Sequence, residues 1–166
     1  ISRKQIKEDE FFSKTKLEDL LDEMLTSFKE TSSKEIILIS KDNKNNFNFQ
    51  RSPELIYGLR NFIGNAIKFS KSKVEIILFS DNENVSIAIN DDGPGFPDDI
   101  KEIIGEPYIK SKSSLVSSNS GTGLGTFLGK TLLERQSANL HFTKDKKLGG
   151  ASVNINWNIK NLQSNF

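Results

Sequence analysis

The chain alternates amphipathic helical segments with pairs of strand-like segments, and this order constrains the fold more than any other feature of the sequence. Apolar residues repeat at helical spacing over 17–28, 52–70 and 124–134. Thr15 and Glu18 form a capping box before the first of these helices, and an N-cap serine followed by proline starts the second. The sequence therefore predicts three main helices.

Each predicted helix is followed by two segments rich in β-branched and aromatic residues. Strand pairs are expected at 34–41 with 47–49, at 73–80 with 84–90, and at 138–144 with 151–159. Each pair is separated by a short polar segment, which predicts a hairpin. The fold class is therefore α+β: a two-layer α/β sandwich with one mixed sheet of about five strands and the three helices on one face.

A length of 166 residues fits one domain, which we expect to span 15–160. Residues 1–14 are predicted to be a linker or the end of a preceding dimerisation helix, and 161–166 a C-terminal tail. The start at Ile1 suggests an excised fragment, from which a membrane anchor could have been removed. The serine-rich stretch 110–123 is predicted to be a mobile lid.

Charge and cysteine content exclude several classes of function. The formal net charge is +1, so no global field favours nucleic acid or an anionic membrane, and any anion site must be local. The sequence contains no cysteine, which excludes disulfides, thiolate zinc sites and a cysteine nucleophile. A cytoplasmic location suits this composition.

Three polar residues share one stripe of the helix predicted at 52–70. Asn61, Asn65 and Lys68 stand at i, i+4 and i+7, beside a broad apolar face. A stripe that simply faces water is the plain interpretation, but asparagine is a mediocre helix former. Carboxamide oxygens suit Mg²⁺ shared with phosphate, and a lysine one turn away could contact that phosphate.

Two glycine-containing segments are further candidates for ligand contact. Asp91 ends a predicted strand and is followed by Asp-Gly-Pro-Gly, where a plain turn is the alternative to a carboxylate that accepts the adenine amino group. Residues 121–125, Gly-Thr-Gly-Leu-Gly, directly precede a predicted helix whose N-terminus favours phosphate. Neither the P-loop nor the dinucleotide fingerprint fits the glycine spacing there.

Taken in this order, the three segments resemble the N, G1 and G2 boxes of the histidine-kinase branch of the GHKL ATPases, over about residues 15–159. The resemblance implies the Bergerat ATP-binding fold with a flexible ATP lid. It also implies the ATP-binding catalytic domain of a two-component sensor histidine kinase, which binds Mg-ATP and transfers the γ-phosphate to a histidine of an upstream dimerisation domain.

The resemblance assigns a role to each box residue. Asn61 and Asn65 would hold Mg²⁺ and, with Lys68, would make up the catalytic set. Phe69 would lie near the adenine or ribose, and Asp91 would bind the adenine amino group. The remaining nucleotide-binding positions would be Gly93, Gly95, Lys112, Gly121, Thr122, Gly123, Leu124 and Gly125.

Two departures from the family pattern are informative. Residues 104–108 stand where the F box is expected, with glycine in place of its first phenylalanine, and 149–151 resemble a weakened third glycine box. Together with 130–135, the altered F box resembles the RegB/PrrB group of redox-responding sensor kinases. That group carries its redox-active cysteine outside this domain.

The residue type at position 61 also distinguishes the branches of this family. ATP-hydrolysing relatives such as gyrase, Hsp90 and MutL carry a glutamate where this chain has Asn61, and an amide cannot act as a general base. Anti-sigma serine kinases commonly carry that glutamate too. A nucleotide-binding regulatory module and an anti-sigma-type serine kinase remain the alternative functions.

The only histidine, His141, lies in an alternating strand-like segment with no acidic residue after it in the manner of a phosphoacceptor box. The acceptor is therefore expected on the upstream dimerisation domain of the same protein. The other implied partner is a response regulator, and no nucleic acid is expected. The parent protein is expected to be a homodimer that could be anchored to the inner membrane, with this domain in the cytoplasm.

Overall fold

The computed structural model describes residues 14–41, 48–96 and 122–165. Its elements are β1 Lys14–Lys16, α2 Leu17–Thr31, β2 Glu35–Lys41, β3 Asn48–Gln50, α3 Pro53–Phe69, β4 Lys73–Ser80, β5 Asn84–Asp91, α6 Thr122–Arg135, β6 Ala138–Lys144, β7 Ala151–Asn158 and α7 Ile159–Asn165. Within these ranges, no helix is long and apolar enough to cross a membrane.

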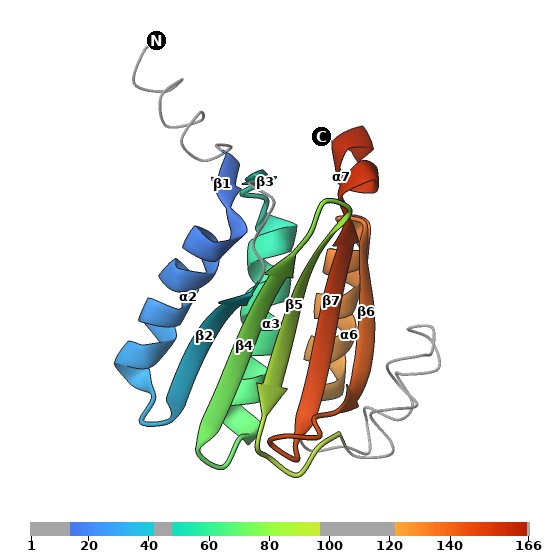
Figure 1. The fold of residues 1–166 in the computed structure, drawn as a ribbon. Coiled ribbons are helices and arrows are strands. Elements are labelled where there is room, and N and C mark those ends of the chain that lie inside the picture. The colour runs from blue at the N-terminus through green and yellow to red at the C-terminus, as the bar shows by residue number, and fades with distance from the viewer. Residues whose placement is uncertain (1–13, 42–47, 97–121, 166) are drawn as a thin grey trace.

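A mixed five-stranded sheet in the order β2-β4-β5-β7-β6 forms one layer, and α3 and α6 lie against one of its faces (Figure 1). The β4–β5 and β6–β7 hairpins form as predicted. On the helix-facing side, alternate residues of the central strands are buried, among them Ile76, Ile87 and Ile155. They join the apolar faces of α2 and α3 in one core, which confirms the predicted two-layer α+β sandwich.

The first predicted hairpin, 34–41 with 47–49, is wrong. β2 pairs in parallel with β4, with Glu35 opposite Lys73, whereas β3 pairs with β1 in a separate two-stranded sheet. Parallel neighbours need a long crossover, and here the crossover contains α3. Local alternation identifies a strand but does not specify which strand lies beside it.

Of the two predicted N-terminal helix caps, one is confirmed and the other is wrong. Ser52 caps α3 as predicted, because its Oγ accepts the Leu55 N–H at 3.1 Å. The capping box at Thr15 and Glu18 is wrong: α2 begins at Leu17 after Lys16, which makes no side-chain cap. Thr15 is part of β1, where extended pairing holds residues 14–16.

The C-terminal segment adds a helix that the sequence did not predict. The expected tail at 161–166 overlaps α7, which begins at Ile159 directly after β7. Ile159 and Leu162 are buried and belong to the core cluster. The apolar contacts of the domain therefore extend into this segment.

Glycines bring α3 and α6 close together. A Cβ added to Gly58 would lie 2.7 Å from Leu133 Cγ, and one added to Gly129 would lie 3.1 Å from the Phe62 ring. Leu133 is fully buried, so it has no room to move aside. The close approach of these two helices brings the polar residues of α3 next to the first turns of α6.

Gly58→Ala is expected to lower the free energy of unfolding by about 1–3 kcal/mol, because the new methyl overlaps Leu133 in a close-packed interface. Urea unfolding would measure this change. Gly64→Ala, in the same helix, is the control: its Cβ would lie 3.7 Å from the Phe28 ring, and alanine favours the helix by about 1 kcal/mol. Equal losses for both variants would contradict the packing explanation.

Candidate functional site

The predicted metal-binding asparagines lie where α3 meets α6, not on a face open to water. Asn65 Nδ2 donates to Asn61 Oδ1 at 3.2 Å and to Thr126 Oγ1 at 3.5 Å. Among the described residues, no hydrogen bond engages Asn65 Oδ1. That oxygen fits a hard cation such as Mg²⁺, and the half-buried Asn61 orients it.

Asp91 ends β5 as a buried carboxylate, 5% exposed. Its Oδ1 accepts the Gly93 N–H at 2.8 Å and the Ala151 N–H at 3.2 Å. Burial raises the pKa of Asp91; the two N–H donors oppose this rise, and the nearby charges of Asp92 and Asp145 add to it. With Oδ1 fixed by the backbone, Oδ2 is the oxygen that can accept a hydrogen bond from a ligand.

The C-terminal end of α3 packs on the loop after Asp91. A Cβ on Gly93 would lie 2.3 Å from the Phe69 carbonyl oxygen, so only glycine fits there. Gly95 has a positive φ of 84° in open space, a conformation that also favours glycine. Phe69 is 38% exposed, and the Lys68 ammonium lies over its ring, 5.3 Å from the centroid. Both residues can therefore contact a ligand beside Asp91.

The turn between β6 and β7 packs against Asp91, and its residues were not among the predicted site residues. Gly150 N donates to the Asp91 carbonyl at 3.1 Å, and a Cβ on Gly150 would lie 2.3 Å from two oxygens of Asp91. The double glycine at 149–150 was the signal in the sequence. Thr126 was also missed, because a single threonine within an apolar helical pattern gives no such signal.

Residues 122–125 of the glycine-rich segment do not precede a helix as predicted. Thr122, Gly123 and Leu124 already belong to the first turn of α6, and Gly125 follows them. The first four N–H groups of a helix lack intrahelical partners, so this turn still presents donors that suit phosphate. A Cβ on Gly125 would lie 3.3 Å from Asn61 Nδ2, so this segment borders the asparagine pair.

Several predicted features lie outside the described residues. Lys112 and Gly121 are among them, as are the altered F box at 104–108 and the lid segment up to residue 121. Their roles stay predictions from the sequence.

Asp92 anchors the loop that follows β5 to the turn after α3. Its carboxylate accepts the backbone N–H groups of Lys71, Ser72 and Lys73 at 2.8–3.2 Å, and the Ser72 hydroxyl at 2.9 Å. Burial opposes ionisation, but these hydrogen bonds outweigh it and lower the pKa of Asp92 to about 2. Asp92 therefore holds the loop of Asp91 against the end of α3.

Asp92→Asn is expected to lower the free energy of unfolding by about 1–2 kcal/mol at pH 7, since a partly exposed charged acceptor is lost. Because the pKa is lower in the folded chain, this stabilisation is present above about pH 4 and is lost as the pH falls toward 2. Urea unfolding should therefore show a smaller difference between wild type and variant at pH 3 than at pH 7. A difference independent of pH would contradict this assignment.

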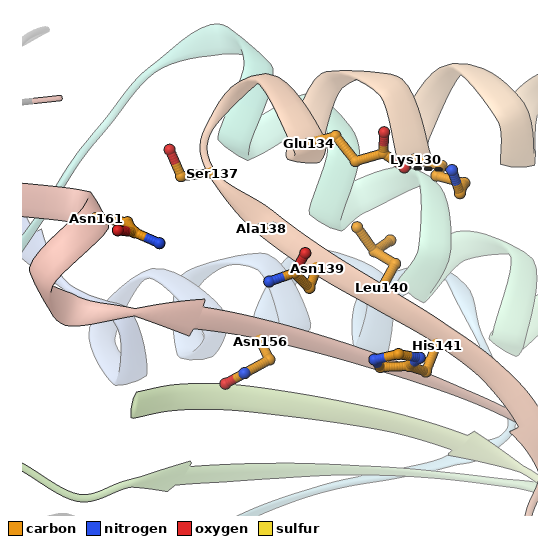
Figure 2. Close-up of a pocket in the computed structure, with 9 residues that line it drawn as sticks. All are labelled: Lys130, Glu134, Ser137, Ala138, Asn139, Leu140, His141, Asn156 and Asn161. Carbon is orange, nitrogen blue, oxygen red and sulfur yellow. Dashed lines mark ion pairs between the residues drawn. The ribbon is translucent and has the colours of Figure 1, made fainter. Parts of the chain in front are cut away.

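A separate cavity of about 760 Å³ lies along β6, between α6 and α7 (Figure 2). Its lining includes three amides, one hydroxyl and one ion pair, and consists of Lys130, Glu134, Ser137, Ala138, Asn139, Leu140, His141, Asn156 and Asn161. None of the predicted site residues lines it. We therefore place the candidate site at the α3–α6 contact and Asp91, and not in this hollow.

The family model for histidine kinase-, DNA gyrase B- and HSP90-like ATPases matches residues 51–161. Sensor histidine kinase RegB of Cereibacter sphaeroides is 42% identical over 97 residues, which cover 55% of this chain and 21% of that protein. Sensor histidine kinase CpxA of Escherichia coli is 29% identical over 116 residues, covering 65% of this chain and 25% of CpxA. The chain thus spans about a fifth to a quarter of these curated relatives.

Solved structures show the same fold. The mycobacterial sensor histidine kinase MprB superposes with a TM-score of 0.68 at 18% identity, covering 89% of this chain and 97% of that one. A nucleotide-free catalytic domain of histidine kinase ThkA superposes with a TM-score of 0.69 at 18% identity, with the same coverage of 89% and 97%. The arrangement of the sheet and helices is therefore that of histidine kinase catalytic domains.

Proposed function

Because the chain belongs to the family of histidine kinase-, DNA gyrase B- and HSP90-like ATPases, we propose that it is the ATP-binding catalytic domain of a sensor histidine kinase. The observation that carries this proposal is the buried carboxylate of Asp91, whose Oδ1 is held by two backbone N–H groups. Oδ2 is left to accept the amino group of adenine, whereas guanine has a carbonyl at that position.

The other site residues would act on the phosphates. Lys68 and the N-terminal N–H groups of α6 are suited to bind them. Asn65, oriented by Asn61, would hold Mg²⁺, which would neutralise phosphate charge when bound. Because the residue at 61 is an amide, this helix has no base there to activate water, and the γ-phosphate is kept for another nucleophile. Phosphoryl transfer depends mainly on positioning and charge stabilisation.

The proposed acceptor is a histidine on an upstream dimerisation domain of the same protein, and a response regulator would receive the phosphate next. The relatives RegB and CpxA are named sensor histidine kinases, which favours this interpretation over a regulatory module or a serine kinase. We further propose that the parent protein is a homodimer, with this domain in the cytoplasm and a membrane anchor elsewhere in its chain.

Transfer of label from γ-labelled ATP tests the proposal, with the upstream domain of the full-length protein supplied in trans. We expect acid-labile phosphate on that domain, none on His141 of the isolated chain, and no transfer by an Asn65→Ala variant. Acid-labile phosphate on His141, or hydrolysis by the isolated chain as fast as transfer, would overturn the proposal. Acid-stable phosphoserine on a partner would instead identify a serine kinase, and binding without transfer a regulatory module.

A further inference from the structure

Thr126 is a buried polar residue of α6 that faces the asparagine pair of α3. Its side chain is 3% exposed, and its Oγ1 accepts Asn65 Nδ2 at 3.5 Å. A buried hydroxyl in a helix interface is costly unless it is hydrogen-bonded. An apolar residue would fill this position at lower cost, so the hydroxyl calls for an explanation.

The contact with Thr126 gives the Asn65 NH₂ group its second hydrogen-bond acceptor. The Asn65 carboxamide has two N–H donors on Nδ2 and one oxygen acceptor. Nδ2 lies 3.2 Å from Asn61 Oδ1 and 3.5 Å from Thr126 Oγ1, so each of these oxygens can accept one of its two N–H groups. With both donors engaged toward α3 and α6, Oδ1 of Asn65 points away from these partners.

Glycines in α6 make this contact possible. An alanine in place of Gly125 would bring its methyl to within 3.3 Å of Asn61 Nδ2, and an alanine in place of Gly129 would bring its methyl to within 3.4 Å of Asn61 Cβ. Since neither glycine carries a Cβ, the backbone of α6 approaches α3 closely enough for a short side chain at 126 to reach Asn65. The separation of the helices and the length of threonine therefore match.

We propose that Thr126 is a positioning residue for the metal site: its hydroxyl holds the Asn65 amide with the oxygen turned toward the magnesium ion of the bound nucleotide. Without the hydroxyl, one N–H loses its partner, and only the contact with Asn61 Oδ1 then opposes rotation of the amide by half a turn. The rotated amide would present its NH₂ group to a cation. This inference rests on the proposed function, in which Asn65 holds the metal.

Calorimetric titration of Mg²⁺ into the chain saturated with ADP tests the role, with ADP binding in EDTA as the metal-free reference. Thr126→Val removes the hydroxyl at nearly constant volume, and we expect a half-saturating Mg²⁺ concentration higher by about five- to tenfold. Affinity for ADP in EDTA should stay within about twofold of wild type, because the adenine pocket is untouched. Thr126→Ser keeps the hydroxyl and should have the same half-saturating Mg²⁺ concentration as wild type.

Three outcomes separate the possible failures. If wild type and Thr126→Val show the same Mg²⁺ requirement, the positioning role is wrong although the proposed function stands. If wild type binds neither ADP nor Mg-ADP, the proposed function itself fails. Should Thr126→Val fold poorly by circular dichroism, Thr126→Ala removes the same hydroxyl without adding a methyl, and the same rise is expected; its absence there would overturn the role.

Discussion

Replacing Asp91 with asparagine is expected to weaken binding of ATP by between about tenfold and 100-fold, while the chain stays folded. The Gly93 and Ala151 N–H groups that hold Oδ1 can still donate to the asparagine oxygen in the same place. The amide NH₂ would then replace Oδ2 and face the adenine amino group. In the variant, two N–H donor groups would face each other. In the wild type, the charged Oδ2 of Asp91 would accept a hydrogen bond from the adenine amino group.

The same substitution should change which base is preferred. Guanine carries a carbonyl oxygen where adenine carries its amino group, so the NH₂ group of the variant could donate to it. We therefore expect the affinity for GTP to rise while the affinity for ATP falls. The ratio of ATP to GTP affinity should then fall by more than the loss of ATP affinity alone. A pocket that had simply collapsed would lose both nucleotides together.

Calorimetry with Mg-ATP and Mg-GTP measures both effects. Asp22→Asn is a matched control, because it makes the same acid-to-amide change at an exposed position of α2. The control should bind ATP as wild type does. An unchanged ATP affinity in Asp91→Asn would show that Asp91 does not contact the base, and the proposed adenine site would have to be abandoned.

Gly150→Ala should have a comparably large effect through a different cause. The new Cβ would lie 2.3 Å from the carbonyl oxygen of Asp91, 2.3 Å from its Oδ1 and 2.6 Å from Gly93 N. Two of these atoms are backbone, so no side-chain rotation relieves the overlap. The turn must move away from Asp91, which removes the Gly150 hydrogen bond and disturbs the Ala151 N–H beside it.

We expect Gly150→Ala to lower nucleotide affinity at least about tenfold and the free energy of unfolding by about 1–3 kcal/mol. Gly149→Ala separates overlap from backbone strain. Gly149 has a positive φ of 86° but nothing within 4 Å of its Cβ position. The Gly149→Ala variant should therefore lose about 1 kcal/mol in its free energy of unfolding and keep most of its nucleotide affinity. Titration calorimetry and urea unfolding of both variants would measure this contrast, and equal losses of affinity would contradict it.

The two variants act on one structural unit. Asp91, the loop after it and the β6–β7 turn are held together by N–H groups from Gly93, Gly150 and Ala151. Asp92 ties the same loop to the turn after α3 through Ser72 and its neighbours. The predicted nucleotide-binding residues at the end of α3 and at Asp91 are therefore fixed relative to each other by backbone donors, and not by long side chains.

Much of the fold followed from local patterns in the sequence. The apolar repeat and the Ser52 cap located α3, and alternation located the β4–β5 and β6–β7 hairpins, because their partners are adjacent in the chain. The first hairpin was wrong because β2 pairs with a strand beyond α3. The capping box at Thr15 failed because strand pairing fixed residues 14–16 in an extended conformation.

For the candidate site, too, the sequence gives the local features and the tertiary structure gives the long-range ones. By itself the sequence determined which groups are available at the proposed nucleotide site: the amides of Asn61 and Asn65, the carboxylate of Asp91 and the glycines around them. Only the tertiary structure decided how those groups are oriented. Asp91 is held by Ala151, 60 positions away, and Asn65 by Thr126, 61 positions away. Hydrogen bonds of that separation form only when the sheet and helices pack, so no local pattern encodes them.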